Sequence, residues 1–332
     1  MIYLILIIGL ITAFINGAHD GGTIVATSIT SRLITQKQAA VLSGLCNFAG
    51  AVLLGTAVAY TVASGLLDTD ALLADSSGRV GLFVLAAFMG SIIWNVFTWV
   101  VSLPSSASHS MIGAMVGCGL AGYGLDFIHW DTFFIKIILA MLISPVIGFA
   151  AGFLLIKAQN FLLRNATIVW NRRIRVLEII STVLEACFHG SNDAQKVIGL
   201  TAIGIAGCEG TDLTMPLWLI VSCSAALAIG TMCGGSNMIR AVGKDIIKVD
   251  SDKAFASQLA SILVTEFSNL TGLPISSTQI ITGSVMGVGT ENTPKSVNWS
   301  VSGKIAISWI TTIPASALMG ALILKILTSV VL

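Results

Sequence analysis

The sequence predicts an all-α polytopic membrane protein, built from two inverted-topology repeats that contain broken or re-entrant helices. Hydrophobic residues make up 55% of the 332 residues, and charged residues only 10%. A soluble domain carries about 25% charged residues, so this chain has too few charges to cover a water-exposed surface. The 17 basic residues are balanced by 16 acidic ones, which argues against the basic footprint of a nucleic-acid-binding protein. Motifs of the first half also recur in the second.

A helix that crosses a bilayer needs about 20 apolar residues, and ten segments of the chain are candidates. They are residues 1–31, 38–64, 80–101, 103–125, 132–156, 176–207, 214–239, 254–272, 273–290 and 303–332. The first and sixth carry polar residues in the middle, and the fourth and ninth open on Pro- and Ser-rich turns. We expect broken or re-entrant helices in these four segments, because irregular backbone in a membrane is tolerated only where it is buried or lines a wet cavity.

Three common sequence features are missing. The six cysteines form no C-x-x-C pair, so neither a disulfide framework nor a zinc site is expected. The N-terminus has no basic n-region and no small-residue cleavage site, so the first apolar segment is expected to stay in the mature chain. No G-x-x-x-x-G-K-[ST] motif occurs, so we expect no use of nucleotides.

The charges of the connecting loops predict how the segments are oriented. Loops after the first, fifth and seventh segments are basic: Arg32, Lys37, Lys157, Arg164, Arg172, Arg173, Arg175, Arg240, Lys244 and Lys248. Loops after the second and sixth are acidic: Asp68, Asp70, Asp75, Glu209 and Asp212. Basic loops face the cytoplasm, so with all ten segments crossing, both termini lie outside the cell. Residues 158–175 then form a basic cytoplasmic linker between a first repeat, 1–157, and a second, 176–332.

Matched motifs define the repeat. Asn16–Asp20 matches His189–Asp193, and Leu103–His109 matches Leu273–Gln279. Behind the second match, three glycines recur at the same spacing: Gly113, Gly117 and Gly119 correspond to Gly283, Gly287 and Gly289. Two halves with five crossings each have opposite orientations. Inverted repeats with broken helices are typical of secondary transporters, which hold the substrate between the halves at mid-membrane.

Asp20 and Asp193 occupy matched places inside apolar segments. A carboxylate in a membrane segment costs several kcal/mol unless it is paired or hydrated, and therefore indicates a functional site. The structural alternative is a cap on a helix break. Glu185, His189 and Asp193 follow at helical spacing with Lys196 beyond them, which places them along one face. This stripe indicates a wet pathway, and a self-neutralising ion-pair ladder is the alternative.

The two Leu-Pro turns each place hydroxyl side chains before a glycine-rich helix. A helix N-terminus offers free N–H groups and a positive dipole end, which together bind anions. The alternative is that small residues only permit close helix packing. The candidate substrate ligands are Asp20, Asp193, Ser105, Ser106, Ser108, Ser276, Ser277 and Thr278, and the candidate pathway residues are Glu185, His189, Lys196, His109 and Gln279.

Carboxylates beside an anion site repel the anion by several kcal/mol at short range and low dielectric. A bound cation or proton relieves this repulsion, so anion binding becomes tied to a cation. This coupling is the physical basis of symport.

At Asn16–Asp20, His189–Lys196 and the two Leu-Pro turns, the sequence resembles the PiT family of inorganic phosphate transporters, over essentially the whole chain. The resemblance implies cation-coupled uptake of inorganic phosphate at the plasma membrane, with Na+ or H+ as coupling ion, no other cofactor, and a homodimer. The candidate cation-binding or coupling residues are Asn16, His19, Asp20, Thr23, Asn47, Asn192, Asp193, Gln195 and Gln258, with Na+ at Asp20 and Asp193.

The chain departs from the family pattern at three positions. Asn47 and Gln258 stand where similar proteins carry glutamate, and Gln279 stands where histidine is usual. These changes leave sulfate, or another tetrahedral oxyanion, as an alternative cargo. Two other function classes are alternatives: an intramembrane aspartyl hydrolase that uses Asp20 and Asp193 as a pair, and a passive anion channel.

Overall fold

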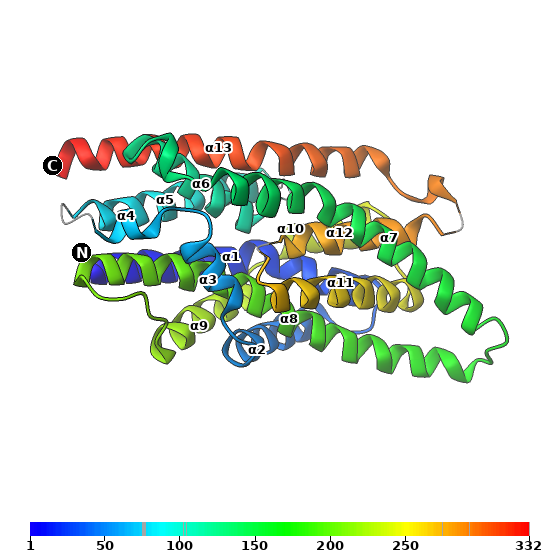
Figure 1. Ribbon diagram of the computed structural model, residues 1–332. Helices are drawn as coiled ribbons and strands as arrows, with labels where there is room; N and C mark the ends of the chain where they lie inside the picture. The colour runs from blue at the N-terminus through cyan, green and yellow to red at the C-terminus, as the bar shows by residue number, and fades with distance from the viewer. Residues whose placement is uncertain (75–77, 102, 104, 274, 292, 332) are drawn as a thin grey trace.

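The computed structural model describes residues 1–74, 78–101, 103, 105–273, 275–291 and 293–331. Within these ranges every regular element is helical, and the helices run roughly along one long axis (Figure 1). The chain ends lie at the same end of the molecule, which we call the terminal end (Figure 1). This agrees with an even number of end-to-end passages.

The first half contains α1 (Ile2–Thr30), α2 (Gln36–Leu53), α3 (Ala57–Ser64), α4 (Thr69–Leu73), α5 (Arg79–Val100), α6 (Ala107–Gly122), η1 (Leu125–Phe127), η2 (Thr132–Ile138) and α7 (Leu139–Leu162). The second half contains α8 (Val169–Glu209), α9 (Leu217–Cys233), α10 (Ser236–Arg240), η3 (Ala241–Asp245), α11 (Ser251–Thr271), α12 (Ser277–Gly289), η4 (Pro294–Ser296) and α13 (Trp299–Val331).

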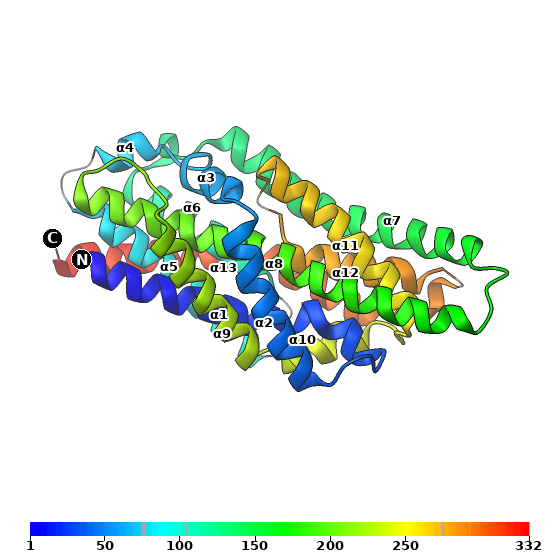
Figure 2. The ribbon, with the colours of Figure 1, turned by 90° about the horizontal axis from the view of Figure 1, so that it is seen from below.

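Helices α5 and α6 form a hairpin that enters from the terminal end and turns back near the middle. The Phe83 and Tyr123 rings meet at its base, with centroids 6.2 Å apart, and Thr98 Oγ1 and Ser105 Oγ lie 2.8 Å apart at its tip. Helices α11 and α12 form a second hairpin from the opposite end (Figure 2). There the Asn298 N–H donates to Ile246 O at 2.9 Å, which ties the segment after α12 to the segment before α11.

The expectation that all ten segments cross is therefore wrong for four of them. Segments 80–101, 103–125, 254–272 and 273–290 are the arms of the two hairpins. The 13 residues of α12 extend about 20 Å, too short for a hydrocarbon core of about 30 Å. Each half keeps an odd set of passages in the described chain: α1, α2 with α3, and α7; then α8, α9 with α10, and α13. The halves are still opposite in orientation.

The expected breaks in the first and sixth segments are absent. Helix α1 runs unbroken through Asp20, and α8 runs unbroken through Asp193 over 41 residues. Neighbouring side chains supply the partners of both carboxylates, so the helix backbone does not have to open. The expected linker 158–175 is also mostly helical, since its ends belong to α7 and α8.

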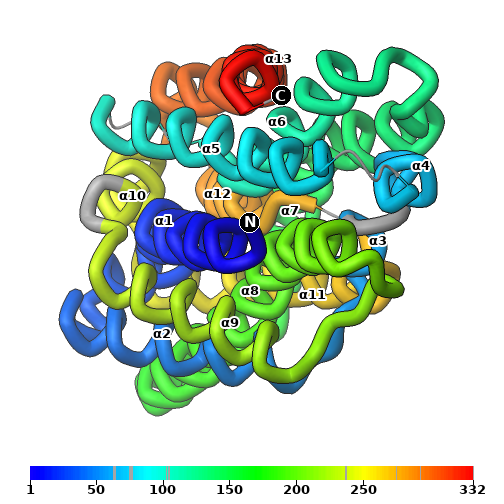
Figure 3. Tube along the Cα trace, turned by 90° about the vertical axis from the view of Figure 1, so that its left-hand side faces the viewer, coloured from blue at the N-terminus to red at the C-terminus, as the bar shows by residue number. Residues whose placement is uncertain are grey.

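Glycines set the contacts between the hairpins and their supports. A Cβ atom at Gly117 of α6 would lie 1.9 Å from Ala317 O of α13, and one at Gly287 of α12 would lie 2.1 Å from Phe149 O of α7. The two glycines are repeat partners, so each hairpin packs through matched glycines against a helix from the other half. Seen from the terminal end, α5, α6 and α13 lie on one side of α1, and α2 and α9 on the other (Figure 3).

Candidate functional site

The N-termini of α6 and α12 begin with the same local geometry. Ser106 Oγ accepts from the His109 N–H at 3.3 Å, and Ser276 Oγ accepts from the Gln279 N–H at 3.4 Å. Both serines are therefore N-caps, which is the structural role that Ser favours at this position. Each hydroxyl accepts from its own helix and keeps its O–H proton, so the role of Ser106 and Ser276 as substrate ligands stays a prediction.

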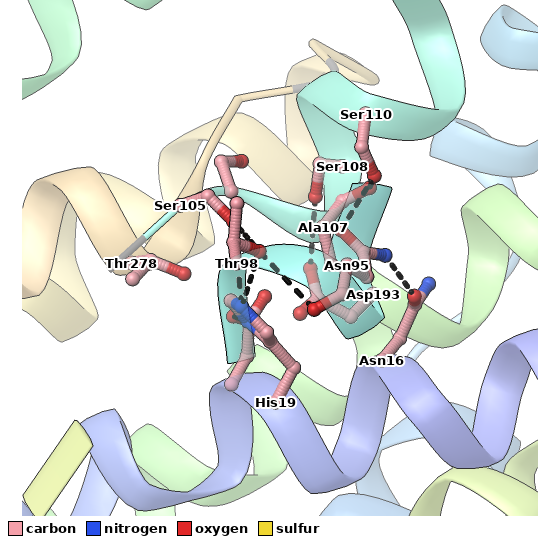
Figure 4. A network of polar contacts seen from close by, with 12 residues as sticks. Asn16, His19, Asn95, Thr98, Ser105, Ala107, Ser108, Ser110, Asp193 and Thr278 are labelled. Atoms are coloured by element: carbon pink, nitrogen blue, oxygen red, sulfur yellow. Dashed lines mark hydrogen bonds and ion pairs between the residues drawn. The ribbon is translucent and has the colours of Figure 1, made fainter. Parts of the chain in front are cut away.

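Asp193 of α8 lies between the hairpin tips, buried and surrounded by polar groups (Figure 4). Its Oδ1 accepts from Lys196 Nζ at 2.9 Å and from Ser108 Oγ of α6 at 3.4 Å. Its Oδ2 lies 3.2 Å from His189 Nε2. Lys196 Nζ also donates to the carbonyl of Ile275, at 3.1 Å, just before α12. The Asp193 and Lys196 pair thus touches both hairpins.

Asp20 of α1 is connected to the first hairpin through His19. His19 Nδ1 lies 2.7 Å from Asp20 Oδ1, and His19 Nε2 lies 3.2 Å from Thr98 Oγ1 and 3.3 Å from Ser105 Oγ. All four side chains are buried, and Figure 4 shows His19, Thr98 and Ser105 together. Asp20 and Asp193 therefore have different surroundings although the sequence matches them.

Three further polar residues belong to this region and were missed in the sequence. Thr98 contacts His19, as described. Asn95 Nδ2 donates to Asn16 Oδ1 at 3.0 Å, and Asn192 Nδ2 donates to Asn269 Oδ1 at 2.9 Å. The signal that could have found them is their place: each is a buried polar residue in an apolar segment shortly before a Leu-Pro turn.

Four of the residues expected to bind the cation, Gln195, Asn47, Thr23 and Gln258, make no hydrogen bond to either aspartate in the described part of the chain. Gln195 Oε1 accepts from Val58 N at 2.7 Å and caps α3. Asn47 Nδ2 donates to Thr231 Oγ1 at 3.0 Å. Among the described residues, Thr23 Oγ1 is buried and has no hydrogen-bond partner.

Gln258 belongs to a separate polar cluster between α1, α8 and α11. Its Nε2, which has two protons to donate, lies 3.0, 2.7 and 3.1 Å from Thr27 Oγ1, Ser28 Oγ and Thr182 Oγ1. Its Oε1 accepts from Ser181. The hydrogen bonds of Gln195, Asn47 and Gln258 thus go to residues other than the two aspartates, and Asn47 Oδ1 is buried without a hydrogen-bond partner among the described residues.

The expected pathway residues also separate. His189 and Lys196 contact Asp193, whereas Glu185 is buried opposite Ser261 of α11. His109 is buried, and neither ring nitrogen has a hydrogen-bond partner in the described part of the chain. Gln279 lines an apolar cavity of about 480 Å³ between α7, α12 and α13.

The arrangement suits an oxyanion together with a cation. The first free N–H groups of α6 and α12 are those of Ala107, Ser108, Ser277 and Thr278, and the positive ends of two helix dipoles meet there. Ser277 Oγ is buried and without a partner among the described residues. The carboxylate, amide and hydroxyl oxygens nearby are ligands that hard cations prefer.

A family model described as the phosphate transporter family matches residues 16–320 of this chain. The chain belongs to the phosphate transporter family. It is 34% identical over 325 residues to a probable low-affinity inorganic phosphate transporter of Rhizobium meliloti (strain 1021), covering 96% of this chain and 95% of that protein. A Bacillus subtilis (strain 168) protein of the same description is 33% identical over 330 residues, covering 98% and 97%.

A solved structure titled "The sodium-dependent phosphate transporter" has the same fold, with a TM-score of 0.90 at 22% identity, covering 100% of this chain and 99% of that one. Members of this family are transporters, so the protein is a multi-pass membrane transporter and not an enzyme. The aspartyl hydrolase alternative is wrong.

Proposed function

We propose that this protein takes up inorganic phosphate together with Na+ or H+, by alternating access across the plasma membrane. One observation carries the proposal. The N-termini of two helices that enter from opposite ends meet beside the buried Asp193, with Ser108 of one hairpin and the Ile275 carbonyl of the other in contact with the Asp193 and Lys196 pair.

The anion would lie between the two helix N-termini. Backbone N–H groups and hydroxyls can donate to several phosphate oxygens, as at other helix N-termini. The carboxylate of Asp20 repels such an anion at short range in a low dielectric, so a cation near Asp20 stabilises the loaded site. The protein then changes between its two access states more readily when it is empty or fully loaded than when it holds the anion alone. This difference is the condition for symport.

The packing supports movement of one hairpin at a time. Helix α6 rests on α13 and α12 rests on α7, so the two hairpins are supported by different helices. Opening the α5–α6 tip exposes the centre toward the terminal end, and opening the α11–α12 tip exposes it toward the other end.

Phosphate is favoured over sulfate by the site and by the relatives. The departures at Asn47 and Gln258 prompted the sulfate alternative, but both amides bond to groups outside the hairpin tips. Both curated relatives above are described as phosphate transporters. Sulfate is accordingly an outcome of the test and no longer an equal candidate.

The test is radiolabelled phosphate uptake into proteoliposomes under imposed Na+ or proton gradients, with unlabelled sulfate as competitor. We expect gradient-driven uptake that excess sulfate leaves unchanged. Asp20→Asn and Asp193→Asn should each abolish coupled uptake, while Asp212→Asn, on an exposed loop, should behave as wild type. Near-normal uptake by both site variants, at equal protein content, contradicts the proposal.

A further inference from the structure

We infer that Lys196 is a built-in cation: its ammonium group takes, in the second half, the place that a mobile coupling cation takes beside Asp20 in the first. The inference rests on the proposed function and goes further, because it assigns one mobile cation site to the centre of the transporter instead of two.

The surroundings of Lys196 Nζ are those of a cation site. Four oxygens of different types surround it: the Ser108 hydroxyl at 2.5 Å, the Asp193 carboxylate at 2.9 Å, the Ile275 carbonyl at 3.1 Å and the Asn192 amide oxygen. Hydroxyl, carboxylate, carbonyl and amide oxygens are the ligands that proteins use for hard cations. The residue is 1% exposed, so water contributes little to its stabilisation.

The ammonium also satisfies the charge requirement of this half. An uncompensated buried carboxylate costs several kcal/mol, and the Asp193 charge is paired at 2.9 Å by a group that cannot leave. A mobile cation at Asp193 would therefore meet an occupied site and a charge already neutralised.

The first half lacks the tethered charge. The shift that places Asp20 on Asp193 places Thr23 on Lys196. Thr23 is buried and uncharged, and its hydroxyl has no hydrogen-bond partner in the described part of the chain. The repeat partner of Asn192 is His19.

His19 does not have to be charged to satisfy its contacts. A neutral ring with its proton on Nδ1 donates to Asp20 at 2.7 Å. Its Nε2 then accepts from the Thr98 or Ser105 hydroxyl, at 3.2 or 3.3 Å. With His19 neutral, no fixed cation among the described residues lies against Asp20, and this is where a mobile cation belongs.

Lys196→Gln tests the inference, because it keeps a hydrogen-bonding side chain and removes the charge. The opened site should then require a second mobile cation. Two quantities are measured: the Hill coefficient for activation of phosphate uptake by whichever cation, Na+ or H+, drives it, and the charge moved per phosphate, from the reversal potential in proteoliposomes. We expect the variant to need a higher concentration of that cation, to depend on it more steeply, and to move one more positive charge per phosphate. Lys244→Gln, at an exposed position, is the matched control and should change neither quantity.

Two results overturn the inference. An unchanged charge per phosphate in an active Lys196→Gln variant is one. A higher half-saturating phosphate concentration at saturating Na+, with the same Na+ dependence, is the other, because it makes Lys196 a ligand of the substrate alone.

If Lys196→Gln is inactive or does not fold, the inference is tested by cation binding to the purified wild-type protein. The number of Na+ ions bound per protein at equilibrium is measured with radioactive Na+. We expect Asp20→Asn to lose the central Na+ ion and Asp193→Asn to lose none. A wild-type protein with two central Na+ ions, one lost with each aspartate, overturns the inference. If the wild-type protein transports no phosphate at all, the proposed function is contradicted instead. The number of bound cations is still measured independently of transport and tests the inference by itself.

Discussion

At the scale of single residues, serines that look alike in the sequence have different tasks. Ser106 accepts from the backbone of its own helix, whereas Ser108, two residues later, contacts both Asp193 and Lys196. Composition and spacing identify the turn as a site, but they do not tell which hydroxyl points at the helix backbone. That depends on where the helix begins, and α6 begins at Ala107.

The pair Ser106→Ala and Ser108→Ala separates these tasks. Loss of the cap should lower the free energy of unfolding by about 1 kcal/mol and leave the half-saturating phosphate concentration unchanged. Loss of the Ser108 hydroxyl should raise that concentration severalfold with little change in the unfolding temperature. Thermal unfolding in detergent and uptake kinetics measure the two effects. Equal losses of phosphate affinity in both variants would argue that Ser106 also binds substrate.

For Gln195, helical spacing alone argues against a place beside Asp193. It is two positions from Asp193, and two residues on an α-helix point to nearly opposite sides. The structure has Gln195 on the face toward α3, and the Glu185, His189, Asp193 stripe on another. The two aspartates could be found from the sequence because they are repeat partners, and Lys196 because it follows Asp193 at helical spacing. The place of Thr98 and Asn95 before a Leu-Pro turn marks them as candidates, but their contacts could not be predicted, since their partners lie 79 positions away in the chain.

At the scale of elements, the hairpins are the main difference from the expected topology. The length of apolar sequence predicted that each arm crosses the membrane, because an arm that crosses only halfway is as apolar as a full span. The available clue was the Pro- and Ser-rich turn that opens segments 103–125 and 273–290, where re-entrant helices were expected; α6 and α12 begin at these turns. The direction of each arm is fixed by contacts between remote segments, such as the ring contact of Phe83 with Tyr123, which a single segment does not contain.

The matched glycines that hold the hairpins to α13 and α7 give a prediction about packing. Gly117→Ala and Gly287→Ala would each place a methyl group against a backbone carbonyl, at 1.9 and 2.1 Å. Each should therefore destabilise the protein by about 1–3 kcal/mol, the usual range for overpacking.

Gly303→Ala is the control, since no atom of the described residues lies within 4 Å of its Cβ position in α13. This variant should gain about 0.5–1 kcal/mol from better helix propensity. Unfolding temperatures in detergent measure all three variants. Unchanged stability in both hairpin variants would mean that α6 and α12 can shift away from their supports at little cost.

At the scale of the whole molecule, the loop charges sort by end as the sequence predicted. The turns after α1 and α7, and the segment before α11, lie at the end opposite the termini (Figure 1). Arg32 lies in the first of these turns, Arg172 in the first turn of α8 and Lys244 in η3 before α11. The acidic loop that holds Asp212 lies at the terminal end. This separation survives the loss of four crossings, because a hairpin returns the chain to the end from which it started.

The rule that basic loops face the cytoplasm predicts that both termini lie outside. An alkaline phosphatase fusion after Leu332 should be active, because this reporter folds only outside the cytoplasm, and a green fluorescent protein fusion there should be dark. The same reporters inserted at residues 163–168, between α7 and α8, should give the reverse. A fluorescent C-terminal fusion would invert the assignment of the two ends.

The unbroken α8 has a consequence for biogenesis. Of the described helices, those long and apolar enough to cross a membrane alone are Ile2–Thr30, Arg79–Val100, Thr132–Leu162 and Trp299–Val331, and α8 is not among them. A charged residue at the centre of a helix costs about 2.5–3.5 kcal/mol during insertion, and α8 carries Asp193, Lys196 and Glu185. It therefore has to enter the lipid beside earlier helices, and the partners from α11 and α12 are synthesised only after it. The ribosome delivers the most polar span of this transporter before its last stabilising contacts exist, so α8 sets the step at which an unassisted chain is most exposed to quality-control proteases.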